Sequence, residues 1–173
     1  MAAILFNFEN SKTKEYLASI GGIVVCLNHL EHFIEFMIWE LINPKVDNAN
    51  KSQLIGERIT VNLEYIEKLE LLRSLIIERK GIEKAEEFKE IYIKCKKACE
   101  IRNDISHSLW SIEFGNNKEG ISPSTTKTNM QKAFQRGKNF DFLSAYKQVN
   151  LDELKLEMNQ INQTISDLFS FFM

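Results

Sequence analysis

Residues 82–109 of the chain read IEKAEEFKEIYIKCKKACEIRNDISHSL. Apolar side chains recur in this stretch at steps of three or four residues, which is the spacing of one face of an α-helix. The residues on that face are Phe88, Ile91, Cys95, Ala98, Arg102, Ile105 and Leu109. The stretch therefore predicts a helix that begins near Ile82 and carries one guanidinium, that of Arg102, on its apolar face.

Three further segments have the same helical spacing. They run from about Thr13 to Ile42, from about Gln53 to Lys80, and from Asn150 to about Phe172. Pro44 ends the first helix because proline disfavours a helical residue before it, and Gly81 ends the second because glycine commonly follows a helix C-terminus. In the last segment Asn150 occupies the N-cap position and Glu153 follows three residues later, as in a capping box. Four helical segments favour an all-α fold, a bundle of four to five helices.

The region before the last helix has a different pattern. Residues 109–114 are β-prone, Gly115 and Gly120 favour turns, and residues 121–130 are rich in Ser and Thr. We expect a small irregular or β-hairpin excursion over approximately residues 111–150. Residues 114–150 contain six Lys or Arg and two Asp or Glu, so this region is locally basic with a net charge of +4.

The composition fits one folded domain over residues 1–173. Hydrophobic residues make up 44% of the chain and charged residues 27%, which is enough apolar material for a core and argues against a disordered chain. Seven Gly and two Pro leave long stretches without a backbone breaker. A net charge of −2 excludes a polycation that coats nucleic acid nonspecifically, so any anionic ligand has to be held locally.

The sequence favours a cytoplasmic protein that does not contact a membrane. Its start lacks a basic region, and the apolar run from Ala2 to Phe6 is shorter than the roughly 7–15 residues of a signal peptide. Polar residues interrupt the apolar stretch from Ile20 to Ile42, which argues against a membrane span. The three cysteines are an odd number without disulfide spacing, as in a reducing compartment.

The side chains that could take part in catalysis lie in residues 100–108, EIRNDISHS. A guanidinium among apolar neighbours needs an anion, either a carboxylate or a ligand phosphate. At about 100° per residue Asn103 and His107 share a helix face, toward which the long Arg102 side chain can curl. A fixed positive charge, an orienting amide and an imidazole are the groups that RNA cleavage by the ribose 2′-OH requires, and no metal is needed.

The sequence Arg102-Asn103-Asp104-Ile105-Ser106-His107 resembles the Arg, polar, three variable residues, His motif of HEPN domains. HEPN domains are helical bundles with this motif near the end of the third core helix. The resemblance covers six residues as a motif and roughly residues 13–172 as an architecture. It implies an endoribonuclease in which Arg102 stabilises the phosphorane, His107 is general acid or base and Asn103 orients them. In one subfamily of HEPN toxins, nucleotidyl transfer to a tyrosine two residues after the His inactivates the toxin. This chain has Leu109 at that position, so inactivation by that modification is not supported.

The resemblance also implies partners. HEPN sites are commonly composite sites of a homodimer, and the many apolar positions of the first helix independently favour a second copy. Family members act as toxins and in phage defence, which implies an RNA substrate and an antitoxin or guide RNA partner. The rival interpretation is a non-catalytic helical module that binds RNA, a nucleotide or a protein. A third interpretation is a bundle with a purely structural role. In that case the substitution Arg102→Met should leave the stability of the protein unchanged or increase it.

Several side chains allow more than one interpretation. Glu31 or Glu35 could pair with Arg102, although a solvated helix face is the more common role of such residues. The cysteines with His29 and His32 could be drawn as a zinc site, but free Cys on apolar faces is far commoner, so we expect neither a metal nor another cofactor. The basic region either guides RNA to the pocket or is a solvated loop, and its candidate substrate-binding residues are Lys127, Lys132, Arg136 and Lys138.

Overall fold

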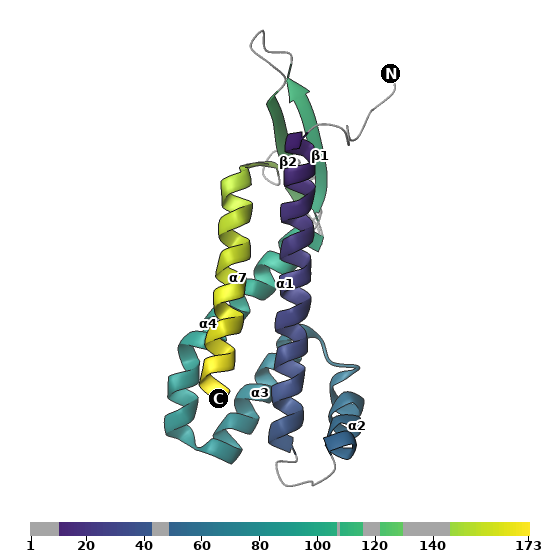
Figure 1. The fold of residues 1–173 in the computed structure, drawn as a ribbon. Coiled ribbons are helices and arrows are strands. Elements are labelled where there is room, and N and C mark those ends of the chain that lie inside the picture. The colour runs from purple at the N-terminus through teal and green to yellow at the C-terminus, as the bar shows by residue number, and fades with distance from the viewer. Residues whose placement is uncertain (1–10, 43–48, 107, 116–121, 130–145) are drawn as a thin grey trace, which may run out of the picture. The chain divides into compact units, whose positions relative to one another are not determined.

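The structure is a computed structural model of the chain, and it describes residues 11–42, 49–106, 108–115, 122–129 and 146–173. Most of these residues are helical, so the predicted helical character of the fold is confirmed. The described residues contain five α-helices (Figure 1): α1 (Ser11–Ile42), α2 (Ala49–Thr60), α3 (Tyr65–Lys80), α4 (Ile82–Ser106) and α7 (Leu151–Phe172).

The part of the chain that the structure describes also contains three strands. They are β1 (Ser108–Gly115), β2 (Ser122–Asn129) and β3 (Tyr146–Val149), and they form an antiparallel sheet in the order β1-β2-β3. The sheet falls in the region for which the sequence predicts an excursion from the helical pattern. The placement of Leu109 at the end of a helical stripe is wrong, because α4 ends at Ser106 and Leu109 pairs with Thr128 across β1 and β2. The β-prone residues 109–114 instead pair with residues of β2 along the whole of β1, and these cross-strand pairs stabilise the sheet.

The chain divides into two compact units. Unit 1 consists of residues 1–24 and 101–159, and unit 2 consists of residues 25–100 and 160–173. Unit 1 contains the sheet and the beginnings of α1 and α7, and there the Tyr16 hydroxyl donates a hydrogen bond to the Val149 carbonyl (3.4 Å). Helices α1, α4 and α7 each contribute residues to both units.

Unit 2 has an apolar core to which four helices contribute. Its fully buried side chains include Leu30, Ile34 and Ile38 of α1, Leu69, Leu72 and Ile76 of α3, Phe88 and Cys95 of α4, and Ile161 and Leu168 of α7. Each such side chain contributes roughly 1.5–3 kcal/mol by leaving water. Phe33 packs against Phe169 (ring centroids 5.7 Å apart), and Phe88 packs against Phe171 (5.4 Å), so α7 is tied to both α1 and α4.

The prediction of one helix from Gln53 to Lys80 is wrong, because α2 ends at Thr60 and α3 begins at Tyr65. The Leu63 amide donates to the Thr60 carbonyl (3.1 Å), which closes a turn after α2. The Glu64 amide then donates to the carboxylate of Glu67 (2.8 Å), which caps α3. Glutamate is not among the preferred N-cap residues, so this helix start has no strong signal in the sequence.

The last helix begins as predicted. The Asn150 side-chain oxygen accepts a hydrogen bond from the Asp152 amide (3.0 Å), which satisfies one of the free amides of the first turn of α7. Helix α1 also matches its predicted extent and continues through Gly21 and Gly22 without interruption.

Helix α1 is long and apolar enough to span a membrane, with a mean hydropathy of 1.4 over its 18-residue window. The core helix of a soluble bundle has the same properties. In this structure 28% of that window is buried inside the protein, and Ile23, Leu30, Ile34 and Ile38 have no exposed surface. The cytoplasmic location therefore remains a prediction from the sequence.

At Gly56 the backbone of α2 lies close to Trp39 of α1. A methyl group there would lie 2.0 Å from Cδ1 of Trp39, whose ring is fixed by a hydrogen bond from its Nε1 to the Thr60 hydroxyl (3.2 Å). By contrast, a methyl group at Gly21 of α1 would meet nothing within 4 Å.

Gly56→Ala should therefore destabilise the protein by about 1–3 kcal/mol through overpacking, although alanine is normally the better helix residue. Gly21→Ala should instead stabilise it by about 0.5–1 kcal/mol. Urea unfolding followed by circular dichroism measures both changes. A Gly56→Ala protein as stable as the Gly21→Ala protein would contradict the close approach of α2 to Trp39.

Candidate functional site

The motif residues that the structure describes lie in the last turn of α4. Ile105 is buried, Arg102 and Asp104 are half-buried, and Asn103 is exposed. Phe88, Cys95 and Ala98 on the same helical stripe are also buried, as the spacing predicted. Arg102 thus lies on the apolar stripe without being fully enclosed, and α4 presents an arginine and an adjacent amide at its C-terminal end.

The other predicted site residues are distributed differently. His107 lies outside the described residues, and so do Lys132, Arg136 and Lys138. Lys127 lies in β2, opposite Trp110 of β1 and Lys147 of β3. Within the described residues the structure therefore brings Arg102 and Asn103 together and assigns Lys127 to the middle strand of the sheet.

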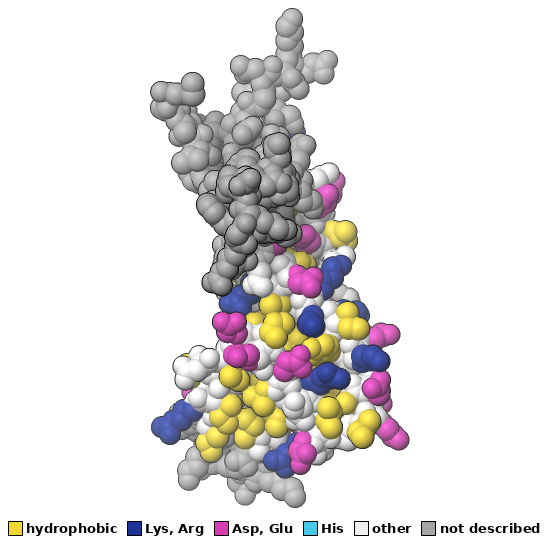
Figure 2. Space-filling view, turned by 180° about the vertical axis from the view of Figure 1, so that it is seen from behind, with side chains coloured by type: hydrophobic (Ala, Val, Ile, Leu, Met, Phe, Trp, Pro, Cys, Tyr) yellow, Lys and Arg dark blue, Asp and Glu magenta, His cyan; other side chains and the backbone are white. Residues whose placement is uncertain are grey.

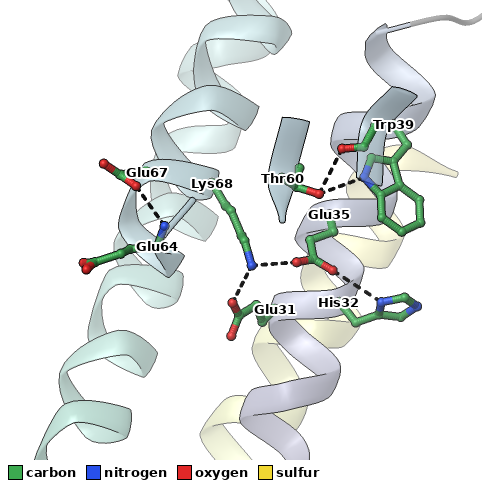
Figure 3. Close-up of polar contacts among 9 residues, drawn as sticks. Glu31, His32, Glu35, Trp39, Thr60, Glu64, Glu67 and Lys68 are labelled. Carbon is green, nitrogen blue, oxygen red and sulfur yellow. Dashed lines mark hydrogen bonds and ion pairs between the residues drawn. The ribbon is translucent and has the colours of Figure 1, made fainter. Parts of the chain in front are cut away.

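Glu31 and Glu35 do not form a solvated helix face. The ammonium group of Lys68 lies 2.7 Å from Glu31 Oε1 and 2.6 Å from Glu35 Oε1 (Figure 3). The side chain of Lys68 is only 8% exposed, and those of the two glutamates are 17% and 19% exposed. This nearly buried cluster joins α3 to α1.

Sequence reasoning missed Lys68, because a lysine in a predicted helix is normally assigned to the solvated side. One signal was present: Lys68 directly precedes Leu69 and lies four residues before Leu72, on the buried side of α3. Burial disfavours the charged form of Lys68, but the hydrogen bonds to Glu31 and Glu35 outweigh it, so the pKa of Lys68 is raised above its ordinary value. The ammonium group is therefore charged at neutral pH.

A pocket lies beside this cluster, between α1 and the end of α2. It has a volume of about 440 Å³, is open to solvent, and is lined by His32, Glu35, Trp39, Glu57, Arg58, Thr60 and Val61. His32 Nδ1 is 3.5 Å from Glu35 Oε2, so Glu35 contacts Lys68 with one oxygen and His32 with the other (Figure 3). The pocket thus borders a carboxylate whose position is held from two sides.

Cys95 and Cys99 of α4 are buried, and Cys26 of α1 is half-buried. Burial raises the pKa of Cys95 to about 12, so its thiol is protonated at neutral pH. The Tyr65 hydroxyl donates to the Cys95 carbonyl (3.1 Å), and the Cys26 thiol donates to Asn162 Oδ1 (3.2 Å). Among the residues that the structure describes, no group of three His, Cys, Asp or Glu side chains is arranged to hold a metal ion.

Large apolar side chains are exposed on several helices, and Figure 2 shows such side chains lying among charged ones on one face of the described surface. In unit 2, Val25 and Phe36 of α1 and Phe169 of α7 are 52%, 42% and 46% exposed. Phe33 lies between the two phenylalanines, with ring centroids 6.4 Å from Phe36 and 5.7 Å from Phe169. The three phenylalanines form an apolar group on α1 and α7.

Comparison of the chain with protein-family models, with curated proteins and with solved structures finds no match. Neither a relative nor a structural neighbour therefore assigns an activity to Arg102, Asn103 or the pocket beside Glu35. The chemistry of the side chains themselves has to supply the functional argument.

Proposed function

We propose that the protein is a metal-independent endoribonuclease of HEPN type. The observation that carries this proposal is the motif Arg102-Asn103-x3-His107, with Arg102 half-buried on the apolar stripe of a long helix. A half-buried guanidinium can hold a phosphoryl oxygen more strongly than a fully hydrated one. The predominantly helical fold is consistent with a HEPN-like bundle.

The proposed reaction is attack of the ribose 2′-OH on the adjacent phosphate. An imidazole of His107 takes the 2′-OH proton as the 2′-O–P bond forms, and a protonated acid gives a proton to the 5′-oxygen as the P–O5′ bond breaks. Arg102 stabilises the negative charge of the phosphorane, and Asn103 orients the reacting groups. The products are a 2′,3′-cyclic phosphate and a 5′-OH, and no cofactor takes part.

We propose further that two copies form a composite site, so that one His107 acts as base and the other as acid. The group of Phe33, Phe36 and Phe169, two of which are largely exposed, supports association, because grouped apolar side chains at a surface commonly mark a contact with another molecule. The biological role that suits this activity is that of a cytoplasmic toxin or phage-defence effector. Its silencing partner would be an antitoxin or a guide RNA.

The experiment is incubation of the purified protein with end-labelled RNA in excess EDTA. Cleavage that leaves a 5′-OH and a 2′,3′-cyclic phosphate is the expected result. RNA that is bound but not cut would instead support the rival function, a non-catalytic RNA-binding module. Sedimentation of the protein with and without RNA measures association in the same samples, and a strictly monomeric active protein would contradict the composite site.

A further inference from the structure

We propose that a cross-strand row in the sheet of unit 1 binds a single-stranded segment of RNA. The row consists of Trp110 of β1, Lys127 of β2 and Lys147 of β3, and we call it the basic row. The inference rests on the proposed function and deepens it, because it assigns the part of the protein that holds the substrate strand. Lys127 is a candidate from the sequence, whereas Trp110 and Lys147 join it through the register of the sheet.

The register places the three residues of the basic row on one face of the sheet. Trp110 pairs with Lys127 on one side of β2, and Lys147 pairs with Lys127 on the other. Residues that pair directly across an antiparallel sheet occupy the same face, and the face alternates along each strand. An aromatic residue and two basic residues from three strands are therefore next to one another.

The neighbouring row on the same face has a different character. It consists of Ile112, Thr125 and Val149, which carry no charge. Val149 is only 3% exposed, so the sheet is covered by the protein at this row. Lysine is almost never fully buried, so the change from an uncharged row to the basic row indicates where the packed part of this face ends.

The charge of this face is complementary to RNA. Glu113 is the one acidic residue of the three described strands, and the register places it on the opposite face, paired with Ser124. Within these strands the face of the basic row has two lysines and no acidic residue, a formal charge of +2. Like charges directly opposite one another, such as Lys127 and Lys147, disfavour an antiparallel pair. A phosphate of RNA beside both positions would turn this repulsion into attraction.

Trp110 makes the basic row better suited to a single strand than to a duplex. Sites for single-stranded nucleic acid combine aromatic rings, on which unpaired bases stack, with basic side chains along the backbone. The row also follows the motif closely in the chain, because α4 ends at Ser106 and the four residues to Trp110 span at most about 14 Å. A strand bound at the row therefore lies within a few nucleotides of Arg102.

The test measures binding of the full chain to a fluorescein-labelled oligouridine of about twelve nucleotides, with every 2′-OH methylated. This RNA cannot be cleaved by 2′-OH attack, so its binding is measured whether or not the protein is a ribonuclease. Fluorescence anisotropy at several salt concentrations gives the Kd and its salt dependence. The single strand should bind at least about tenfold more tightly than the duplex that it forms with oligoadenosine.

Substitutions separate the two parts of the basic row. Lys127→Gln with Lys147→Gln should raise the Kd by about tenfold or more, and should lower the slope of log K against log salt by about 1.4, roughly 0.7 for each lysine. Trp110→Leu should raise the Kd by about tenfold without changing that slope, because stacking releases no counterions. Lys84→Gln with Lys89→Gln, which removes two exposed lysines near the beginning of α4, is the matched control and should leave the Kd nearly unchanged.

The proposal is overturned if the Lys127→Gln, Lys147→Gln protein binds the methylated strand as tightly as the control protein. Equal binding of the single strand and the duplex would also overturn it. If circular dichroism shows that Trp110→Leu does not fold, the lysine variant, which keeps every apolar residue, decides the test alone.

Cleavage of unmodified RNA, measured separately, distinguishes this proposal from the proposed function. A wild-type protein that cuts no RNA but loses affinity for the methylated strand with the two lysines would support the basic row and contradict the ribonuclease. A wild-type protein that cuts RNA, with a lysine variant that binds the methylated strand unchanged, would contradict the basic row alone.

Discussion

His107→Ala should lower the rate of RNA cleavage by about 10²–10⁴-fold, the usual contribution of general acid–base catalysis. The physical reason is that alanine cannot accept the 2′-OH proton or donate one to the leaving 5′-oxygen. The expected residual rate is not zero, because Arg102 would still stabilise the phosphorane. Single-turnover cleavage of a labelled RNA by wild type and variant measures the ratio directly.

His29→Ala is the matched control for this prediction. His29 is exposed on α1, so its removal deletes the same imidazole from the surface without touching the motif. The control should cleave RNA at the wild-type rate. If His107→Ala cleaves as fast as His29→Ala, with both proteins folded, the catalytic assignment of His107 is lost.

Arg102→Met separates catalysis from a purely structural role. As an endoribonuclease the protein should lose about 10²–10³-fold in cleavage rate, the typical cost of removing one transition-state donor. If Arg102 has only a structural role, the variant should cleave RNA at the wild-type rate, and its stability should be unchanged or increased. The free energy of unfolding, measured beside the cleavage rate, distinguishes the two roles because only the catalytic role predicts slower cleavage by a folded variant.

The apolar spacing of the chain was sufficient to predict α1, α7 and the start of α4, and in α1 and α7 the periodicity and the end signals agree. Pro44 follows α1, and Asn150 caps α7. The spacing failed between Thr60 and Tyr65, where apolar residues continue at helical steps although the backbone turns. Helical periodicity reports which side chains can be buried together, but it does not detect a break that is stabilised by a local cap such as Glu64 with Glu67.

Of the two candidate sites, one could be predicted from the sequence and the other could not. The motif at Arg102 could be recognised because its residues are close in sequence. The cluster of Glu31, Glu35 and Lys68 could not, because its partners are 37 and 33 residues apart and the pairing depends on how α3 packs against α1. A sequence identifies charged residues, but their pairing becomes apparent only from the packed helices.

Lys68→Met should lower the free energy of unfolding by about 3–5 kcal/mol. The substitution removes the ammonium group that contacts both Glu31 and Glu35, so the two nearly buried carboxylates lose a shared cationic partner. Lys94→Met is the matched control, since Lys94 also lies 2.6 Å from a carboxylate, that of Asp167, but at the surface. It should cause a much smaller loss.

A triple variant, Glu31→Leu with Glu35→Leu and Lys68→Met, distinguishes a buried ion cluster from a packing defect. Replacing all three charges with apolar side chains of similar volume should restore stability to the wild-type value or above it, because the three charges and their desolvation cost are removed together. Urea unfolding at pH 7 measures both effects. A triple variant as unstable as Lys68→Met alone would show that the volume of the lysine stem, and not its charge, supports the junction of α1 and α3.

The pH dependence of the Lys68 effect provides an independent test. The pKa of Lys68 is raised above 10.5 in the folded protein, so its stabilising contribution is fully present below that pH and is lost as the pH rises through the folded pKa. The difference in unfolding free energy between wild type and Lys68→Met should be the same at pH 7 and pH 9 and should become smaller above about pH 10.5. The other lysines and the tyrosines titrate in both proteins and largely cancel in this difference. A difference that already declines between pH 7 and pH 9 would mean that Lys68 is not held as an ammonium ion by the two glutamates.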